Sequence, residues 1–201
     1  KAVALEKCPS VSQAAKEALE AQSQPPIRLV LLGDDKNKIE IGNETVMFRH
    51  EEKFHHPAAI GFVIEDSLSN DEIKQRLDKI NKLQFERVGQ LLKTDLIAIK
   101  QTKDAQRFVE AVNLASALVN FGIVLISEDA FGLALALKSL TGKRPLIYAA
   151  TDKNLAELSR LAKEHNAPLA ISFESMDSLS ELTKKANQAG VLDIVIDVNT
   201  G

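Results

Sequence analysis

From about residue 58 onward, short apolar runs alternate with stretches of helical periodicity, and this alternation limits the possible folds more than any other feature. The apolar runs are candidate strands at Ala59–Ile64, Leu96–Lys100, Ile123–Ser127, Leu146–Ala149, Leu169–Ser172 and Ile194–Asp197. Between them, apolar residues recur at helical spacing, as in Ile73, Leu77 and Ile80. Nearly unbroken apolar strands separated by amphipathic helices indicate a parallel sheet covered by helices.

Six strand–helix units fit either a doubly wound sheet or an eight-stranded barrel that lacks about two strands. The first strand is followed by Glu65-Asp66-Ser67-Leu68, where a nucleotide-binding doubly wound sheet would carry a glycine-rich phosphate loop. The sequence therefore predicts an α/β protein with a (β/α)8 TIM-type barrel that is incomplete within these 201 residues. The stretch Leu83–Leu92 interrupts the pattern, and we interpret it as an irregular, strand-like excursion.

Two shorter segments precede the barrel. Residues 1–26 are rich in small helix-forming residues and end at Pro25-Pro26, which predicts a short helical segment followed by a linker. Residues 27–57 contain apolar or alternating stretches at Ile27–Leu32, Lys38–Ile41 and Glu44–Phe48, and Gly42-Asn43 suits a tight turn. We therefore expect a small antiparallel β hairpin at 27–57, leading into a barrel at 58–201.

Composition excludes several classes of protein. The formal net charge is −3, with 25 basic and 28 acidic residues, so nothing favours nucleic acid as a partner. The apolar runs are too short to span a bilayer, and no signal peptide opens the chain, so we expect no membrane association. One cysteine allows no internal disulfide, which predicts a reducing, cytoplasmic location. The chain starts without Met and reads as part of a longer protein.

In a parallel barrel the ligand face is built from residues that follow each strand. Here the candidate ligand-binding residues are Asp66, Glu174, Asp197 and Asn199, in an acidic ring that could bind a cation or supply an acid–base pair. The competing interpretation is that the polar residues of this ring, which also includes Gln101, are mainly helix N-caps, as expected for Asp129, Thr151, Asp152 and Ser175. Lys100 ends a strand and is a weaker candidate for a Schiff base. We predict no catalytic residue with a specific signature.

Two further features raise the possibility of metal binding. His50, His55 and His56 lie beside acidic residues, but their spacing forms no helical pair and Pro57 follows directly, so a polar loop is the favoured interpretation. Cys8 is followed by Pro9, the context of the last cysteine in many iron–sulfur motifs. One thiolate cannot hold a cluster, so Cys8 is either a structural thiol or the last of four ligands whose other three precede Lys1.

Several segments resemble a known family. They are Cys8–Ser12, Ala14–Leu19, Pro25–Ile27, Ile39–Glu51, Phe85–Gln90 and Arg144–Thr151, in this order along nearly the whole chain. Together they resemble the large (gamma) subunit of the corrinoid iron–sulfur protein of the acetyl-CoA decarbonylase/synthase (CO dehydrogenase/acetyl-CoA synthase) system.

This resemblance implies a three-part subunit. Residues 1–26 would be the end of an N-terminal 4Fe–4S domain, with Cys8 as the fourth cluster ligand. The barrel would run beyond Gly201 and be followed by a corrinoid-binding domain. The family subunit forms a heterodimer with a small (delta/beta) subunit. It carries a methyl group on the cobalt of a cobalamin from a methyltetrahydropterin methyltransferase to acetyl-CoA synthase, in anaerobic one-carbon metabolism. The fragment alone would bind neither cofactor and have no turnover.

Two alternatives of other classes stay open. One is a barrel enzyme, either a lyase that uses Lys100 or a pterin-dependent methyltransferase that uses the acidic rim at the carboxyl ends of the strands. The other is an interaction module without a cofactor. The barrel-enzyme alternative predicts binding of a small molecule that is sensitive to Asp197→Ala.

Overall fold

A computed structural model describes residues 12–16, 18, 27–43 and 58–198. The chain forms two compact units, Lys1–Arg28 with Gly42–His55, and Leu29–Ile41 with His56–Gly201. In the first unit, residues 13–16 are helical, in agreement with the predicted helical segment. The hydroxyl of Ser12 accepts a hydrogen bond from the Ala15 N–H at 3.3 Å and so stabilises the start of this helix. Cys8 lies outside the described residues.

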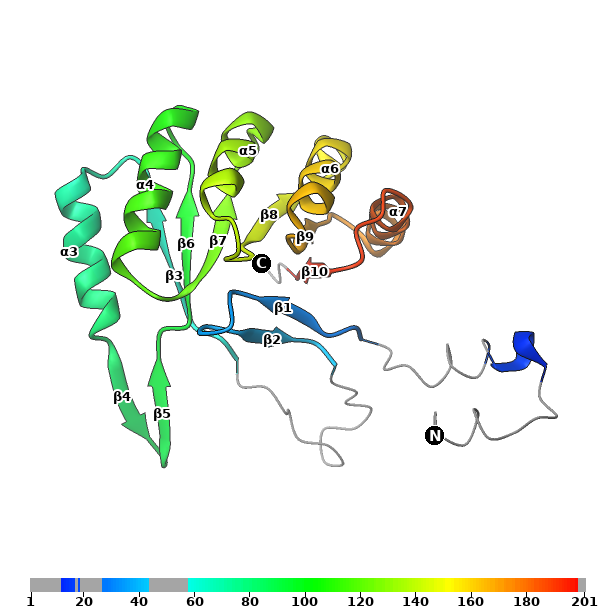
Figure 1. Ribbon diagram of the computed structural model, residues 1–201, viewed down its shortest axis with the longest axis horizontal. Helices are drawn as coiled ribbons and strands as arrows, with labels where there is room; N and C mark the ends of the chain where they lie inside the picture. Colours follow the sequence, from blue (N-terminus) through cyan, green and yellow to red (C-terminus); the bar gives the residue numbers. More distant parts are fainter. Residues whose placement is uncertain (1–11, 17, 19–26, 44–57, 199–201) are drawn as a thin grey trace. The chain divides into compact units, whose positions relative to one another are not determined.

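The second unit is built on a six-stranded parallel sheet (Figure 1). Its strands lie side by side in the order of the chain: β3 (Gly61–Glu65), β6 (Leu96–Lys100), β7 (Gly122–Ile126), β8 (Leu146–Ala150), β9 (Leu169–Ser172) and β10 (Ile194–Asp197). All six predicted strands are confirmed to within two residues at each end. A strand order that follows the chain is the order of a (β/α) barrel, whereas it reverses in a doubly wound sheet. The architecture is therefore consistent with an incomplete TIM-type barrel.

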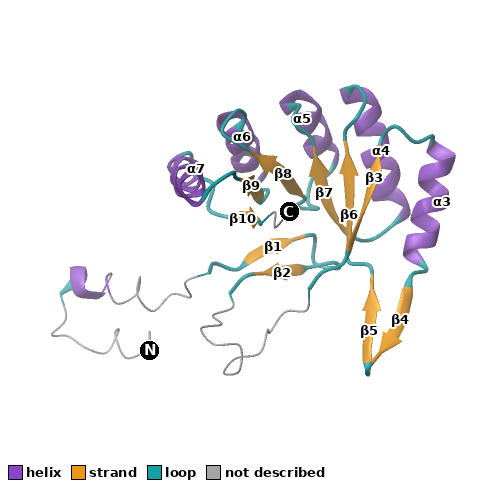
Figure 2. Ribbon diagram, turned by 180° about the vertical axis from the view of Figure 1, so that it is seen from behind, coloured by secondary structure: helices purple, strands orange, loops and turns teal. Residues whose placement is uncertain are grey.

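The five helices of the second unit that the structure describes cover one face of the sheet (Figure 2). They are α3 (Asn70–Asn81), α4 (Ala105–Leu118), α5 (Ala130–Ser139), α6 (Leu155–His165) and α7 (Met176–Gln188). The start of α3 shows why these segments are helical. Ser69 and Glu72 form a capping box, with the Glu72 N–H donating to Ser69 Oγ at 3.3 Å and the Ser69 N–H donating to the Glu72 carboxylate at 2.9 Å. These hydrogen bonds from Ser69 lower the pKa of Glu72.

The main core lies between this sheet face and the helices. Alternate strand residues point toward the helices, and they are fully buried: Ile64, Ile97, Ile99, Leu125, Ile147 and Ile171. Phe108 of α4 and Leu158 of α6 complete this core from the helix side. None of the described helices is long and apolar enough to cross a membrane.

The other face of the sheet is the lumen side, and a small antiparallel hairpin packs against it. Strands β1 (Val30–Leu32) and β2 (Ile39–Ile41) form this hairpin. Leu32 is completely buried in a second apolar cluster with residues of β7, β8 and β9. Gly122 at the start of β7 allows this approach, because a Cβ there would lie 2.7 Å from Ile39 Cδ1. The hairpin thus fills part of the lumen, which in small barrels must be filled by side chains.

The turn that joins β1 to β2 spans residues 33–38. Asp34 stabilises it, since its carboxylate accepts hydrogen bonds from the N–H groups of Lys36 at 2.9 Å and Asn37 at 3.1 Å. The tight turn predicted at Gly42-Asn43 would lead from Lys38–Ile41 into the predicted strand at Glu44–Phe48. That strand lies outside the described residues, so this turn stays a prediction.

The stretch that interrupted the sequence pattern forms a second hairpin. Strands β4 (Gln84–Arg87) and β5 (Gln90–Lys93) pair with each other and with no other described strand. They connect the end of α3 to the start of β6, so the hairpin extends from the amino end of the sheet (Figure 1). We refer to residues 84–93 as the projecting hairpin.

Candidate functional site at the carboxyl end of the sheet

The last residues of several strands make the lumen polar at the carboxyl end of the sheet. Glu65 and Lys100 end the neighbouring strands β3 and β6, and their side chains form an ion pair at 3.6 Å. Tyr148 of β8 donates a hydrogen bond to a carboxylate oxygen of Asp197 in β10, with an oxygen–oxygen distance of 2.7 Å. The lumen therefore changes from the apolar cluster around Leu32 to polar pairs at the rim.

The Tyr148–Asp197 pair has a defined electrostatic character. The hydrogen bond to Asp197, together with burial and the negative charge of that carboxylate, raises the pKa of Tyr148 to about 12. The phenol is thus a hydrogen-bond donor at neutral pH and not a general base. Asp197 has one oxygen engaged by this bond.

Asp66 occupies a different environment from the other rim candidates. It is only 1% exposed, and its carboxylate accepts hydrogen bonds from the Thr102 N–H at 2.7 Å, the Thr102 hydroxyl at 2.6 Å and the Lys103 N–H at 3.1 Å. Arg107 of α4 donates from Nε to the Asp66 carbonyl at 3.0 Å. These contacts join the loops that follow β3 and β6. The placement of Asp66 favours a structural role, and ligand binding by this residue stays a prediction.

A second polar network joins the loops after β6 and β7. The Ser127 hydroxyl donates to Gln101 Oε1 at 2.6 Å and accepts from the Asp129 N–H at 2.9 Å. Gln101 Nε2 lies 3.3 Å from Asp129 Oδ2, and Asp129 Oδ1 accepts from the Phe131 N–H at 2.9 Å. Asp129 is therefore the N-cap of α5, as predicted. The sequence identified Gln101 only as a polar residue that follows a strand. It did not indicate that Gln101 contacts Ser127, which lies 26 residues further along the chain.

The N-cap predictions are confirmed for Asp129 and Ser175 and wrong for Thr151 and Asp152. Ser175 caps α7, and its hydroxyl accepts from the Ser178 N–H at 3.2 Å. At α6 the N-cap residue is Asn154, whose side chain instead accepts from the Thr151 N–H at 2.8 Å. A turn between β8 and α6 thus delays the start of the helix beyond the two predicted caps.

Two adjacent cavities open at this rim, each of about 490 Å³. The first is lined by Lys100, Ser127 and Tyr148 among others. The second is lined by Glu174 and Asp152. Glu128, Thr151 and Ser172 line both. These volumes fall in the range of small-ligand pockets.

The predicted binding residues that the structure describes have different surroundings. Asp66 holds two loops together, Asp197 bonds Tyr148, Glu174 lines the second cavity, and Asn199 lies outside the described residues. Within residues 12–16, 18, 27–43 and 58–198, no three His, Cys, Asp or Glu side chains are grouped so as to hold a metal ion.

The resemblance implies two cofactors, and each needs particular ligands from the protein. A 4Fe–4S cluster needs four thiolates, and the sequence contains one cysteine. The one histidine among the described residues, His165, ends α6 and lies away from the rim, so it offers no axial ligand there to a corrinoid. Neither group fits the described residues alone.

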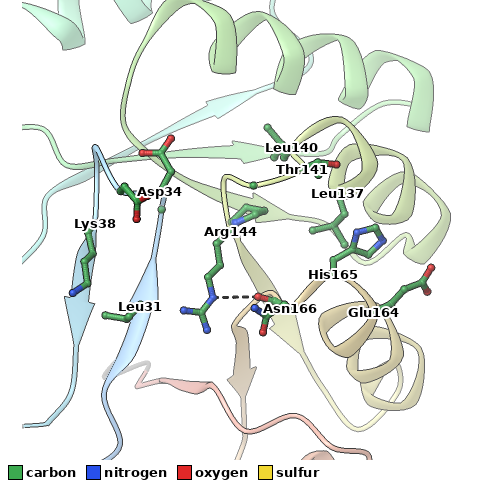
Figure 3. Close-up of a pocket in the computed structure, with 14 residues that line it drawn as sticks. Leu31, Asp34, Lys38, Leu137, Leu140, Thr141, Arg144, Glu164, His165 and Asn166 are labelled. Atoms are coloured by element: carbon green, nitrogen blue, oxygen red, sulfur yellow. Dashed lines mark hydrogen bonds between the residues drawn. The ribbon is translucent and has the colours of Figure 1, made fainter.

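A third cavity lies at the opposite, amino end of the sheet (Figure 3). It measures about 600 Å³ and is lined by the β1–β2 turn and by the carboxyl ends of α5 and α6. Arg144 projects into it but is engaged, because Nε donates to the Asn166 carbonyl at 3.1 Å and the guanidinium also pairs with Asp193. His165, the last residue of α6, lines this cavity.

These features define a protein of the (β/α) barrel class. The strands of the parallel sheet follow the order of the chain and helices cover one face. The β1–β2 hairpin fills part of the lumen with apolar side chains, and polar pairs lie at the carboxyl end. Residues 29–201 match the family described as CO dehydrogenase/acetyl-CoA synthase delta subunit. The chain belongs to this family. The relatives that follow confirm the resemblance to the large (gamma) subunit.

Individual relatives agree with this assignment. The chain is 40% identical over 194 residues to the corrinoid/iron–sulfur protein large subunit of Moorella thermoacetica, covering 96% of this chain and 44% of that protein. It is 31% identical over 202 residues to the acetyl-CoA decarbonylase/synthase complex subunit gamma of Methanothermobacter thermautotrophicus, covering 100% of this chain and 44% of the relative. It is 32% identical over 195 residues to the gamma subunit of Archaeoglobus fulgidus, covering 96% and 41%. The chain thus spans less than half the length of these relatives.

Proposed function

We propose that this chain is the central scaffold of a corrinoid iron–sulfur protein that carries a methyl group on cobalt from a methyltetrahydropterin methyltransferase to acetyl-CoA synthase. The observation that carries the proposal is the 40% identity, over 96% of the chain, to a corrinoid/iron–sulfur large subunit. Methyl transfer would serve anaerobic one-carbon metabolism in the cytoplasm, and the single cysteine is compatible with a reducing compartment.

The geometry of the rim supports a scaffold more than an enzyme. The described polar side chains at the carboxyl end are bonded mainly to one another or to loop backbone, as in Glu65–Lys100, Tyr148–Asp197 and the contacts of Asp66. The first two contacts join strand ends and the contacts of Asp66 join two loops, and no nucleophile–base pair lies among the described rim residues. The cobalt and the cluster supply methyl and electron chemistry when bound elsewhere in the whole protein, and this chain supplies position.

Cys8 has a defined part in this proposal. We propose it as the fourth thiolate ligand of the 4Fe–4S cluster, with three cysteines before Lys1 as the other ligands. The small (delta/beta) subunit, the methyltransferase and acetyl-CoA synthase would be the protein partners. The relatives in Methanothermobacter and Archaeoglobus are named as subunits of a complex, which supports an assembly of this kind.

The alternative is a barrel enzyme, and the rim cavities are the observation that keeps it open. Lys100 is a poor Schiff-base lysine, since it is half-exposed and paired with Glu65, whereas such lysines are desolvated or placed near other cations. A small-molecule site would depend on Asp197. Isothermal calorimetry with a methyltetrahydropterin should then detect binding that Asp197→Ala removes, and a scaffold should show none.

The metal content of the whole protein tests the main proposal. The full reading frame, purified anaerobically with its small subunit, should contain about four irons and one corrinoid. Cys8→Ala should lower iron selectively and leave cobalt in place. A preparation without cobalt, or with iron that is indifferent to Cys8, would overturn the proposal.

A further inference from the structure

The projecting hairpin is the most exposed ordered element of the described chain. All residues of 84–93 except Leu92 are exposed. Three of them are large and apolar: Phe85 is 52% exposed, Leu91 is 62% exposed and Val88 at the tip is 94% exposed. A two-stranded hairpin without a packing partner is marginally stable in water. Exposed apolar side chains on such an element are typical of an interaction site.

Val88 lies at the tip of the projecting hairpin in a backbone conformation that a β-branched residue disfavours. The two turn residues both have positive φ, 51° at Val88 and 72° at Gly89. Asn-Gly is the preferred pair for a two-residue turn of this kind, and a β-branched residue in the left-handed region is strained. Val88 gains no packing within the described chain in return. Its side chain is therefore covered only if something outside the described residues packs against it.

The three apolar side chains do not form one flat face. Register pairs Phe85 with Leu92 and Glu86 with Leu91, so Phe85 and Leu91 point to opposite faces and Val88 caps the end. An element with apolar groups on both faces and at its tip fits a groove, where both faces are covered at once. It does not suit adhesion to a flat surface.

The charges of the projecting hairpin indicate the nature of that groove. Arg87 and Lys93 outnumber Glu86, so the projecting hairpin has a net charge of +1 in a chain of net charge −3. Among the described residues, neither Arg87 nor Lys93 has an ion-pair partner. Carboxylates at the mouth of a groove would complement these two cations, and apolar residues on its floor would cover Val88.

We infer that the projecting hairpin inserts into an apolar, acid-rimmed groove on another protein subunit of the same complex. The inference rests on the proposed function, because the partner with the groove would be another subunit of the complex that is named for the relative from Methanothermobacter. It also has a spatial consequence. The hairpin lies at the amino end of the sheet and the rim cavities at the carboxyl end, so a subunit held by the hairpin leaves the rim free for other contacts.

Binding by the full-length, cofactor-loaded protein tests this inference. The probes are the purified small subunit, methyltransferase and acetyl-CoA synthase from the same source, each titrated by calorimetry. Val88→Asn removes the apolar tip and improves the turn, so it should weaken binding of one probe about tenfold while the melting temperature stays equal or rises. Phe85→Thr with Leu91→Thr should weaken the same probe about a hundredfold, with strand preference retained.

A matched control is Met176→Gln, which removes a similarly exposed apolar side chain, 73% exposed, from α7. It should leave the affinity for that probe within about twofold. Equal affinities of wild type and hairpin variants for every probe would overturn the inference. So would an effect of the variants only on binding to anionic lipid vesicles, or only on self-association.

The two proposals fail in different ways. If the wild-type protein contains iron and cobalt and binds its subunits, but the hairpin variants bind equally well, only the docking inference is lost. If the wild-type protein contains no cobalt and binds none of the three probes, the methyl-carrier function is lost and the docking inference with it.

Discussion

Replacement of Asp66 separates the structural role of this residue from a ligand-binding role. Asp66→Ala removes the acceptor for two backbone N–H groups, of Thr102 and Lys103, and for the Thr102 hydroxyl. A hydrogen bond to a charged group contributes about 1.5–3 kcal/mol, and such contributions are not additive. Because Thr102 and Lys103 are exposed, water can reach their amides in the variant. We therefore expect a loss of about 3 kcal/mol in the local stability of this loop.

Asp66→Asn is the matched variant. One oxygen is retained and can still accept from Thr102, while the new amide group faces the Lys103 N–H, which lies 3.2 Å from Oδ2 in the wild type. Two donors then face each other. The loss should be about 1 kcal/mol, smaller than for alanine.

Amide hydrogen exchange in the full-length protein measures both effects. Exchange through local opening should be about 100-fold faster at Thr102 and Lys103 in Asp66→Ala and about fivefold faster in Asp66→Asn. Unchanged exchange at these two amides, combined with a loss of methyl transfer in both variants, would refute the structural role and favour Asp66 as a ligand residue.

Three other expectations concern the rim, the lumen and the loop contacts. The raised pKa of Tyr148 favours the neutral phenol in the folded state, so its contribution to stability is fully present below pH 10 and is lost as the pH rises to about 12. The tyrosinate absorbance that Tyr148→Phe removes should titrate near 12 in the wild type and closer to 10 in Asp197→Asn. Gly122→Ala should destabilise the protein by about 1 kcal/mol, because its Cβ would lie 2.7 Å from Ile39 Cδ1 and 2.8 Å from Leu96 Cδ2, two side-chain ends that can shift, and Ile39→Val should restore part of the loss in urea unfolding. Arg107→Lys should lower the melting temperature, because one ammonium group cannot replace the guanidinium donors to the carbonyls of Asp66 and Leu68 and to the Asn70 side chain. An unchanged melting temperature in this variant would contradict this reasoning.

Much of the sheet could be predicted because its signal is local. Strands such as Leu96–Lys100 and Leu169–Ser172 are short apolar runs between helical patterns, and the structure has the same bounds. The projecting hairpin was harder to predict, because Phe85 and Leu91 are apolar yet exposed, which breaks the usual link between apolarity and burial.

The rim shows where sequence reasoning was insufficient. Residue type and position after a strand identified Asp66 and Asp197 as neighbours of the carboxyl end, and both lie there. Whether such a carboxylate faces a ligand or a loop depends on contacts across many residues, here with Thr102 and Tyr148. Those contacts follow from strand register and loop path, which periodicity does not specify.

The position of the β1–β2 hairpin in the lumen has a consequence for biosynthesis. Leu32 is synthesised about 90 residues before its neighbour Val124 and about 140 residues before Ala170. At translation rates of about 5–20 residues per second, roughly 5–20 s pass before Val124 is made and roughly 7–30 s before Ala170 is made. The nascent chain must therefore keep this apolar hairpin soluble until β7 to β9 have been synthesised. A chaperone at the ribosomal exit can bind the hairpin during this interval.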